Sequence, residues 1–137
     1  MILLPSKISQ INCLRQIVQQ FFTQYKIDEA YFDEILICVT EAVTNAIRHG
    51  NKENANKFVR LDAQLKRDLL FITVSDEGEG FDPTTLPDPT LPENRTRPGG
   101  RGVYIMKKLC YQVHFKDNGK TIELVFKIRS GGGCDRC

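Results

Sequence analysis

Residues 41–51, with the sequence EAVTNAIRHGN, place a carboxylate, a carboxamide and an imidazole at intervals of four residues. At about 100° per residue, a helix would carry Glu41, Asn45 and His49 along one edge, about 40° apart in succession. The apolar residues of the segment fall on a separate stripe, so this helix could bury one flank and present the polar one. A carboxylate one turn from a carboxamide suits a general base beside a magnesium-binding oxygen. A solvated helix face is the alternative interpretation.

Residues 69–82, LLFITVSDEGEGFD, predict a buried strand that ends in an acidic turn broken by glycine. Asp76 stands at the end of the strand, and Gly78 and Gly80 are free to adopt the positive φ that such a turn can require. Taken alone, this pattern is more often an ordinary turn than a ligand site. Its position relative to the other motifs gives it weight.

A second glycine-rich segment, residues 95–109 with the sequence RTRPGGRGVYIMKKL, leads into a helical pattern of apolar residues. The unpaired N–H groups at such a helix entrance and the helix dipole both favour negative charge, so Gly100 and Gly102 could form an anion site. Arg97 and Arg101 add cationic donors there. A flexible entry loop is the alternative for this segment.

In this order, the three segments resemble the motifs of the GHKL superfamily of ATPases and kinases, which has the Bergerat fold and includes gyrase and the histidine kinases. Residues 41–51 resemble its N box, residues 76–80 its first glycine box and residues 97–102 its second. The resemblance covers roughly residues 5–128. Within the superfamily, the residues of the three motifs and the small size of the chain are most similar to those of the bacterial anti-sigma-factor serine/threonine kinases.

The resemblance implies roles for four side chains. Glu41 matches the general base that would accept a proton from an attacking serine or threonine hydroxyl. Asn45 matches the residue whose side-chain oxygen binds the Mg²⁺ that bridges the phosphates of ATP. Asp76 resembles the carboxylate that accepts a hydrogen bond from the adenine amino group, and Thr121 stands where the family often places a hydroxyl near adenine.

The resemblance also implies roles for the glycines and for one arginine. Gly78 and Gly80 would let the backbone approach the base and ribose, whereas Gly100 and Gly102 would close on the phosphates. Arg97 would lie near the γ-phosphate. The departures from the family are Arg101, which stands where apolar residues are common, and the proline content of the preceding loop.

That loop, residues 82–98, holds five of the six prolines and few large apolar side chains. Such a composition excludes a regular helix or a central strand. Because the loop lies between two nucleotide-binding motifs, we expect it to be a mobile lid over the nucleotide, with a bare linker as the alternative.

The function implied by the resemblance is that of an ATP- and Mg²⁺-dependent serine/threonine protein kinase that is also an anti-sigma factor. Such a protein phosphorylates an anti-sigma factor antagonist and sequesters a sigma factor, and the resemblance alone implies a homodimer. A non-catalytic, nucleotide-gated binding module of the same fold is the alternative. A detached histidine-kinase catalytic domain fits less well, because neither His49 nor His114 lies in a separate phosphoacceptor helix.

The composition agrees with this interpretation. The 137 residues, 41% of them hydrophobic, suit one domain over residues 1–130 and a flexible glycine- and cysteine-containing tail over residues 131–137. A formal net charge of +2 gives no nucleic-acid footprint. No apolar run suits a membrane span or a signal peptide, so we expect a cytoplasmic protein. Cys134 and Cys137 form a CxxC pair, for which a frayed tail is favoured over a metal or redox role.

The helical part of the scaffold can be expected from caps and periodicity. Residues 2–8 predict an edge strand, and Ser9 could cap a helix that runs to about Tyr25. Asp28 is the expected cap of the motif helix, which should end near Gly50.

The strands follow from turn signals. Residues 56–66 and 69–75 predict two paired strands, and Asn118–Gly119 predicts a hairpin between strands at 111–117 and 120–128. Together, these elements predict an α+β fold: a two-layer α/β sandwich in which a largely antiparallel mixed sheet carries helices on one face.

Overall fold

The structure is a computed structural model that describes residues 1–78 and 100–128. Its elements, in chain order, are β1 (Ile2–Pro5), the 3₁₀ helix η1 (Ile8–Cys13), α1 (Leu14–Tyr25), the 3₁₀ turn η2 (Glu29–Tyr31), α2 (Phe32–Asn45), the π-helical turn η3 (Ala46–Gly50), β2 (Phe58–Lys66), β3 (Leu69–Ser75), α3 (Gly100–Leu109), β4 (Gln112–Lys116), the 3₁₀ turn η6 (Asp117–Gly119) and β5 (Thr121–Lys127). None of the described helices is long and apolar enough to cross a membrane.

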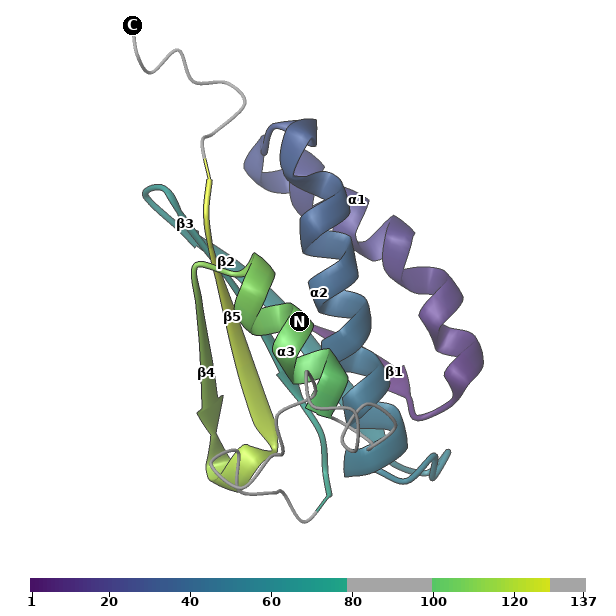
Figure 1. The fold of residues 1–137 in the computed structure, drawn as a ribbon. Helices are drawn as coiled ribbons and strands as arrows, with labels where there is room; N and C mark the ends of the chain where they lie inside the picture. Colours follow the sequence, from purple (N-terminus) through teal and green to yellow (C-terminus); the bar gives the residue numbers. More distant parts are fainter. Residues whose placement is uncertain (79–99, 129–137) are drawn as a thin grey trace, which may run out of the picture.

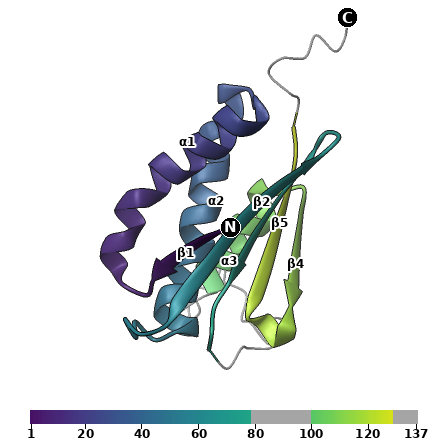
Figure 2. The same cartoon turned by 180° about the vertical axis from the view of Figure 1, so that it is seen from behind.

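The five strands form one sheet with the order β1-β2-β3-β5-β4, so β1 and β4 are its edges. Every pairing among the described strands is antiparallel. The helices α1, α2 and α3 lie on one face of this sheet, and the view from behind shows the other face without a helix (Figures 1 and 2). The predicted α+β sandwich with helices on one face is therefore confirmed, whereas the sheet, expected to be mixed, is antiparallel throughout the described strands.

The core lies between the helices and one face of the sheet. Strand β3 alternates, and its residues Leu70, Ile72 and Val74 are at most 1% exposed. The apolar stripe of the motif helix is also buried, and its members are Ile35, Val39, Ala42, Val43, Ala46 and Ile47. Burial of a side chain of the size of Leu, Ile or Val stabilises a fold by about 1.5–3 kcal/mol. This stripe fixes which edge of α2 faces away from the core.

The two helix starts expected from the sequence differ in outcome. Asp28 caps the 3₁₀ turn η2, because its Oδ1 accepts a hydrogen bond of 2.9 Å from Ala30 N. The N-cap position of α2 itself is Tyr31, which makes no side-chain cap, so the predicted cap lies one 3₁₀ turn before the motif helix. The prediction that Ser9 caps the first long helix is wrong. Ser9 lies inside η1, whose tighter turns satisfy early N–H groups through the backbone, as in the bond of 2.9 Å from Gln10 N to Lys7 O. Helix α1 ends at Tyr25 as expected.

Both predicted hairpins are present. β2 and β3 are joined through Arg67, which takes a φ of 58°. β4 and β5 are joined by η6, where Asn118 and Gly119 have φ values of 56° and 86°. Left-handed conformations at Asn and Gly are the reason that this dipeptide marks a turn.

Candidate active site

The motif helix ends in a wider turn directly after its polar edge. Glu41 and Asn45 are half-buried, and the bond of 2.8 Å from Asn51 N to Ala46 O spans five residues rather than four. Single π turns of this kind occur often at functional sites. His49 lies within the turn and is exposed, and the pKa of its imidazole is lowered by partial burial and then by the charge of Arg48.

Gly102 brings α3 against that polar edge. A Cβ atom on Gly102 would lie 2.9 Å from Glu41 Oε1, 3.2 Å from Asn45 Nδ2 and 3.6 Å from Asn45 Oδ1. Val103 and Met106, which are 5% and 0% exposed, anchor α3 in the core beside this contact. The structure therefore joins the N box to the first turn of α3, where the sequence places the second glycine box.

Asp76 forms a second group with two glycines at the end of η3. A Cβ atom on Gly50 would overlap the carboxylate of Asp76, and a Cβ atom on Gly78 would overlap the carbonyl oxygen of Gly50. The turn after β3 thus packs directly on the end of the motif helix. Asn45 and Gly50 are five residues apart, which is roughly 8 Å along a helix axis. The two groups therefore both lie toward the C-terminal end of the motif helix, one on α2 and the other at the end of η3.

The carboxylate of Asp76 is oriented by the backbone. Its Oδ1 accepts a hydrogen bond of 2.7 Å from Gly78 N, and its own N–H donates to Lys120 O at 2.9 Å. Burial raises the pKa of the Asp76 carboxyl, and this effect is opposed by the Gly78 N–H and by the charges of Lys120 and Lys57. Buried carboxylates with perturbed pKa values are frequent in binding sites.

Gly78 does not adopt the positive φ that a glycine makes available to such a turn. Among the described glycines, only Gly119 has a positive φ. Gly78 is needed for a different reason, since its Cα lies against the carbonyl of Gly50 and leaves no space for a side chain. Close approach between two backbones is a requirement that only glycine meets there.

Thr121 is paired with Ser75, the residue before Asp76, and among the described residues the hydrogen bonds of its hydroxyl are to side chains other than that of Asp76. Its Oγ1 donates to Asp117 Oδ2 at 2.8 Å and shares a bond of 3.0 Å with Ser75 Oγ. Thr121 and Ser75 are directly opposite each other on β5 and β3, so their side chains share a face of the sheet. Its proximity to adenine stays a prediction.

Several predicted site residues cannot be placed. Gly80, Arg97 and the expected lid at residues 82–98 lie outside the described residues, as do Cys134 and Cys137. Gly100 is the first residue of α3.

A family model for the histidine kinase-like ATPase domain matches residues 4–126 of this chain. The chain belongs to this family. Two relatives, each named "Serine-protein kinase RsbW" and found in Staphylococcus aureus strains MSSA476 and JH9, are 27% identical to it over 133 residues. The alignment covers 91% of this chain and 84% of each relative.

The fold of this ATPase-family domain is also similar to a solved structure. The histidine kinase domain from the blue-light activated histidine kinase of Erythrobacter litoralis EL346 superimposes with a TM-score of 0.56 at 17% identity. The match covers 93% of this chain, and the chain spans 63% of that solved chain. The superfamily and fold inferred from the motifs are therefore confirmed.

One cavity of this domain adjoins the Asp76 turn. It has a volume of about 290 Å³ and is lined by Leu3, Phe58, Arg60, Ser75, Asp76 and Glu77. These residues come from β1, β2 and the end of β3, so the cavity lies at the β1 side of the sheet.

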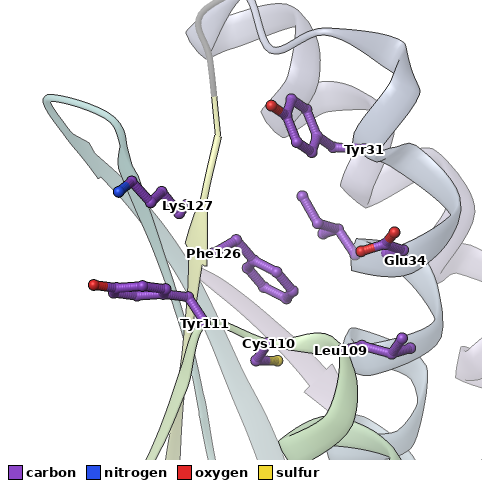
Figure 3. Close-up of a pocket in the computed structure, with 8 residues that line it drawn as sticks. Tyr31, Glu34, Leu109, Cys110, Tyr111, Phe126 and Lys127 are labelled. Atoms are coloured by element: carbon purple, nitrogen blue, oxygen red, sulfur yellow. The ribbon is translucent and has the colours of Figure 1, made fainter.

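A second cavity, of about 230 Å³, lies at the other end of the motif helix (Figure 3). It is lined by Tyr31, Glu34, Ile35, Leu109, Cys110, Tyr111, Phe126 and Lys127. A hydrogen bond to Cys38, followed by burial, raises the pKa of the Cys110 thiol. A thiol with a raised pKa is a poor nucleophile.

Asn51 is the last residue of the N-box segment, and the sequence motifs assign it no role. It follows η3 directly, is 2% exposed and contacts the turn that carries Asp76. An asparagine after a helix is an ordinary terminating residue, so the sequence signalled a helix end and no more.

Proposed function

We propose that this protein is an ATP- and Mg²⁺-dependent serine/threonine protein kinase that phosphorylates an anti-sigma factor antagonist and binds a sigma factor. The contact of Gly102 with Glu41 and Asn45 carries the proposal. It combines a carboxylate, a carboxamide and the first turn of a helix at one place, an arrangement that suits the positioning and charge stabilisation of phosphoryl transfer. The relatives named serine-protein kinase support this reaction type.

In this proposal, the nucleotide lies along the C-terminal part of the motif helix, from α2 to the end of η3. Asp76 would accept a hydrogen bond from the adenine amino group, and the first turn of α3 would face the phosphates with its free N–H groups. Glu41 would accept the proton of the serine or threonine hydroxyl as that oxygen bonds to the γ-phosphorus, while the bond from the γ-phosphorus to the bridging oxygen breaks and ADP leaves. Arg97 and Gly100 would add charge and N–H groups around the phosphates.

The residues present fit a magnesium ion that is shared with nucleotide phosphates. Mg²⁺ usually binds one or two protein oxygens and completes its shell with phosphates and water. Asn45 supplies such an oxygen, and no group of three His, Cys, Asp or Glu side chains in the described residues could hold a metal by itself. Bound Mg²⁺ would neutralise charge that develops on the phosphates.

The regulatory part of the proposal rests on the resemblance of the motifs to anti-sigma-factor kinases. Phosphorylation of the antagonist would release it and leave the kinase free to hold its sigma factor. The protein would act on proteins alone, without direct contact to nucleic acid or membrane, in the cytoplasm. A homodimer is the form that we expect.

Incubation of the purified protein with labelled ATP, Mg²⁺ and a candidate anti-sigma factor antagonist tests the proposal. We expect label on a serine or threonine of the antagonist, and labelling about 10²- to 10⁴-fold slower when Glu41→Gln replaces the native protein. Binding of ATP and of the antagonist without transfer would make the protein a nucleotide-gated binding module instead. Absence of ATP binding would reject both.

A further inference from the structure

Asn51 lies at the meeting point of four segments. It ends the turn η3 and is nearly enclosed, with 2% of its surface exposed. The segments around it are the residue after β1, the first residue of β2 and the turn after β3. A buried carboxamide in such a place must have its hydrogen bonds satisfied, because an unpaired polar group costs about 1–3 kcal/mol.

The hydrogen bonds fix the orientation of this carboxamide. Oδ1 accepts from Glu77 N at 2.7 Å, and Nδ2 donates to Ser6 Oγ at 2.7 Å and to Phe58 O at 3.0 Å. Ser6 Oγ itself donates to Lys57 O at 2.9 Å, so it must accept from Asn51. The reverse orientation would set an NH₂ group against the Glu77 N–H and an oxygen against the Phe58 carbonyl. Only one orientation satisfies every partner.

We propose that Asn51 is a positioning residue for adenine recognition, which it serves by holding the peptide that follows Asp76. The Asp76 N–H donates to the carbonyl oxygen of Lys120, the residue directly before β5, and the next N–H, that of Glu77, donates to Asn51. The carboxylate therefore belongs to a turn that is fixed on one side by the sheet and on the other by the end of the motif helix. The proposal rests on the proposed function, in that it assumes ATP as the ligand.

A residue that positions Asp76 differs from one that only stabilises the fold. Loss of the Glu77 bond should weaken the contact between Asp76 and the adenine amino group, whereas contacts to ribose and phosphates should persist. Ser6 provides a matched control, because Ser6→Ala also removes buried hydrogen bonds of this network while the bond from Glu77 to Asn51 remains. Ser6 is 0% exposed, so both sites are equally deep.

The experiment compares native protein, Asn51→Ala, Asn51→Leu and Ser6→Ala. Leucine has the branching and the number of side-chain heavy atoms of asparagine and is somewhat larger, so Asn51→Leu avoids the cavity that alanine would leave. Dissociation constants are measured for ATP and for purine riboside triphosphate, which lacks the amino group, together with the melting temperature. We expect the Asn51 variants to bind ATP about tenfold more weakly and to bind the analogue within about twofold of native.

For Ser6→Ala, we expect a comparable fall in melting temperature and near-native affinity for both nucleotides. The rate of phosphate transfer at saturating ATP should stay within about threefold of native in the Asn51 variants, because only the binding of adenine is affected. Equal weakening of ATP and the analogue, or equal weakening by Ser6→Ala, would overturn the positioning role.

A measurement on the native protein makes the test independent of how the variants fold. Coupling between two sites is reciprocal, so a bond that favours adenine binding must itself be favoured by bound adenine. The Glu77 amide should therefore exchange its proton more slowly with ATP bound than with the analogue bound, and equal exchange would overturn the proposal. If the native protein binds no ATP, both the positioning role and the proposed function fail. If it binds ATP and the Asn51 variants behave like Ser6→Ala, only the positioning role fails.

Discussion

Gly102 and Glu41 lie so close that a methyl group on the Gly102 Cα would be 2.9 Å from Glu41 Oε1. The side of α3 that faces α2 therefore has space for a carboxylate and a carboxamide only because residue 102 has no side chain. Val103 and Met106 hold α3 in place through the core. The contact makes the position of Glu41 depend on a residue far from it in the sequence.

We predict that Gly102→Ala separates activity from stability. Alanine favours a helix over glycine by about 1 kcal/mol, and the atom that it would crowd is the end of a flexible side chain, so the variant should fold with near-native stability. The displaced Glu41 carboxylate should slow phosphate transfer by at least about tenfold. Single-turnover transfer and thermal unfolding measure the two effects. Lys108→Ala, on the exposed side of α3, is the control and should transfer at the native rate.

Substitution of Asn45 and of Glu41 should impair different steps of the reaction. Asn45→Ala should lose the Mg²⁺-dependent part of its ATP affinity, because Asn45 is assigned to the metal. Glu41→Gln should keep most of its affinity and transfer phosphate about 10²- to 10⁴-fold more slowly. ATP titration with and without Mg²⁺, paired with single-turnover transfer, tests both. Transfer by Glu41→Gln at the native rate would mean that another group is the base.

Elements that depend on local chemistry could be predicted from the sequence. The spacing of Glu41 and Asn45 follows from the helical period, and the buried stripe beside them fixed their edge. The cap at Asp28 and the hairpin at Asn118–Gly119 are likewise properties of a few consecutive residues. The first helix start was missed because Ser9 has the residue type of a cap, whereas the chain there forms a 3₁₀ helix.

Features that depend on tertiary contact could not be predicted. The sequence indicated only that Gly78 is free to adopt a positive φ, whereas its actual constraint comes from the carbonyl of Gly50. Asn51 bonds to Ser6 and Glu77, which are 45 and 26 residues away along the chain. Such pairs leave no local pattern, so a sequence with correctly identified motifs still does not reveal how the motifs are held together.

The glycines around Asp76 should differ in their tolerance of alanine. Gly78→Ala would crowd the backbone of Gly50, which can move only with the turn η3, and we expect a loss of about 1–3 kcal/mol in the free energy of unfolding. Gly50→Ala would crowd a side chain instead, so it should be less destabilising and should weaken ATP binding by displacing Asp76. Denaturant unfolding and calorimetry give the two quantities.

Tyr25→Phe serves as the control for that comparison. It removes the bond of 3.0 Å from Tyr25 Oη to Ala63 O, away from the site. It should cost about 1 kcal/mol and leave ATP affinity unchanged. A loss of ATP affinity in proportion to stability across all three variants would count against a specific role for Asp76.

Asp76→Asn should reduce the preference for adenine. The carboxylate can only accept a hydrogen bond, whereas an amide can present a donor to the amino group, and loss of a charge-assisted bond costs about 1.5–3 kcal/mol. Calorimetry with ATP and GTP measures the preference in both proteins. Equal affinity of the native protein for the two nucleotides would refute the assignment of Asp76.

The same substitution should stabilise the protein without nucleotide, in a manner that depends on pH. Burial raises the pKa of the Asp76 carboxyl above its ordinary value of about 3.9, so the folded state retains a proton that the unfolded state has released. Below the ordinary value, both states are protonated, and the native protein and Asp76→Asn should be similarly stable. As the pH rises from that value to the raised pKa, the native protein should lose stability relative to Asp76→Asn, and the difference should be constant above the raised pKa. Denaturant unfolding of both proteins between pH 3 and 8 measures this difference. A native protein that gains stability over Asp76→Asn as the pH rises would show that the carboxylate is stabilised in the fold.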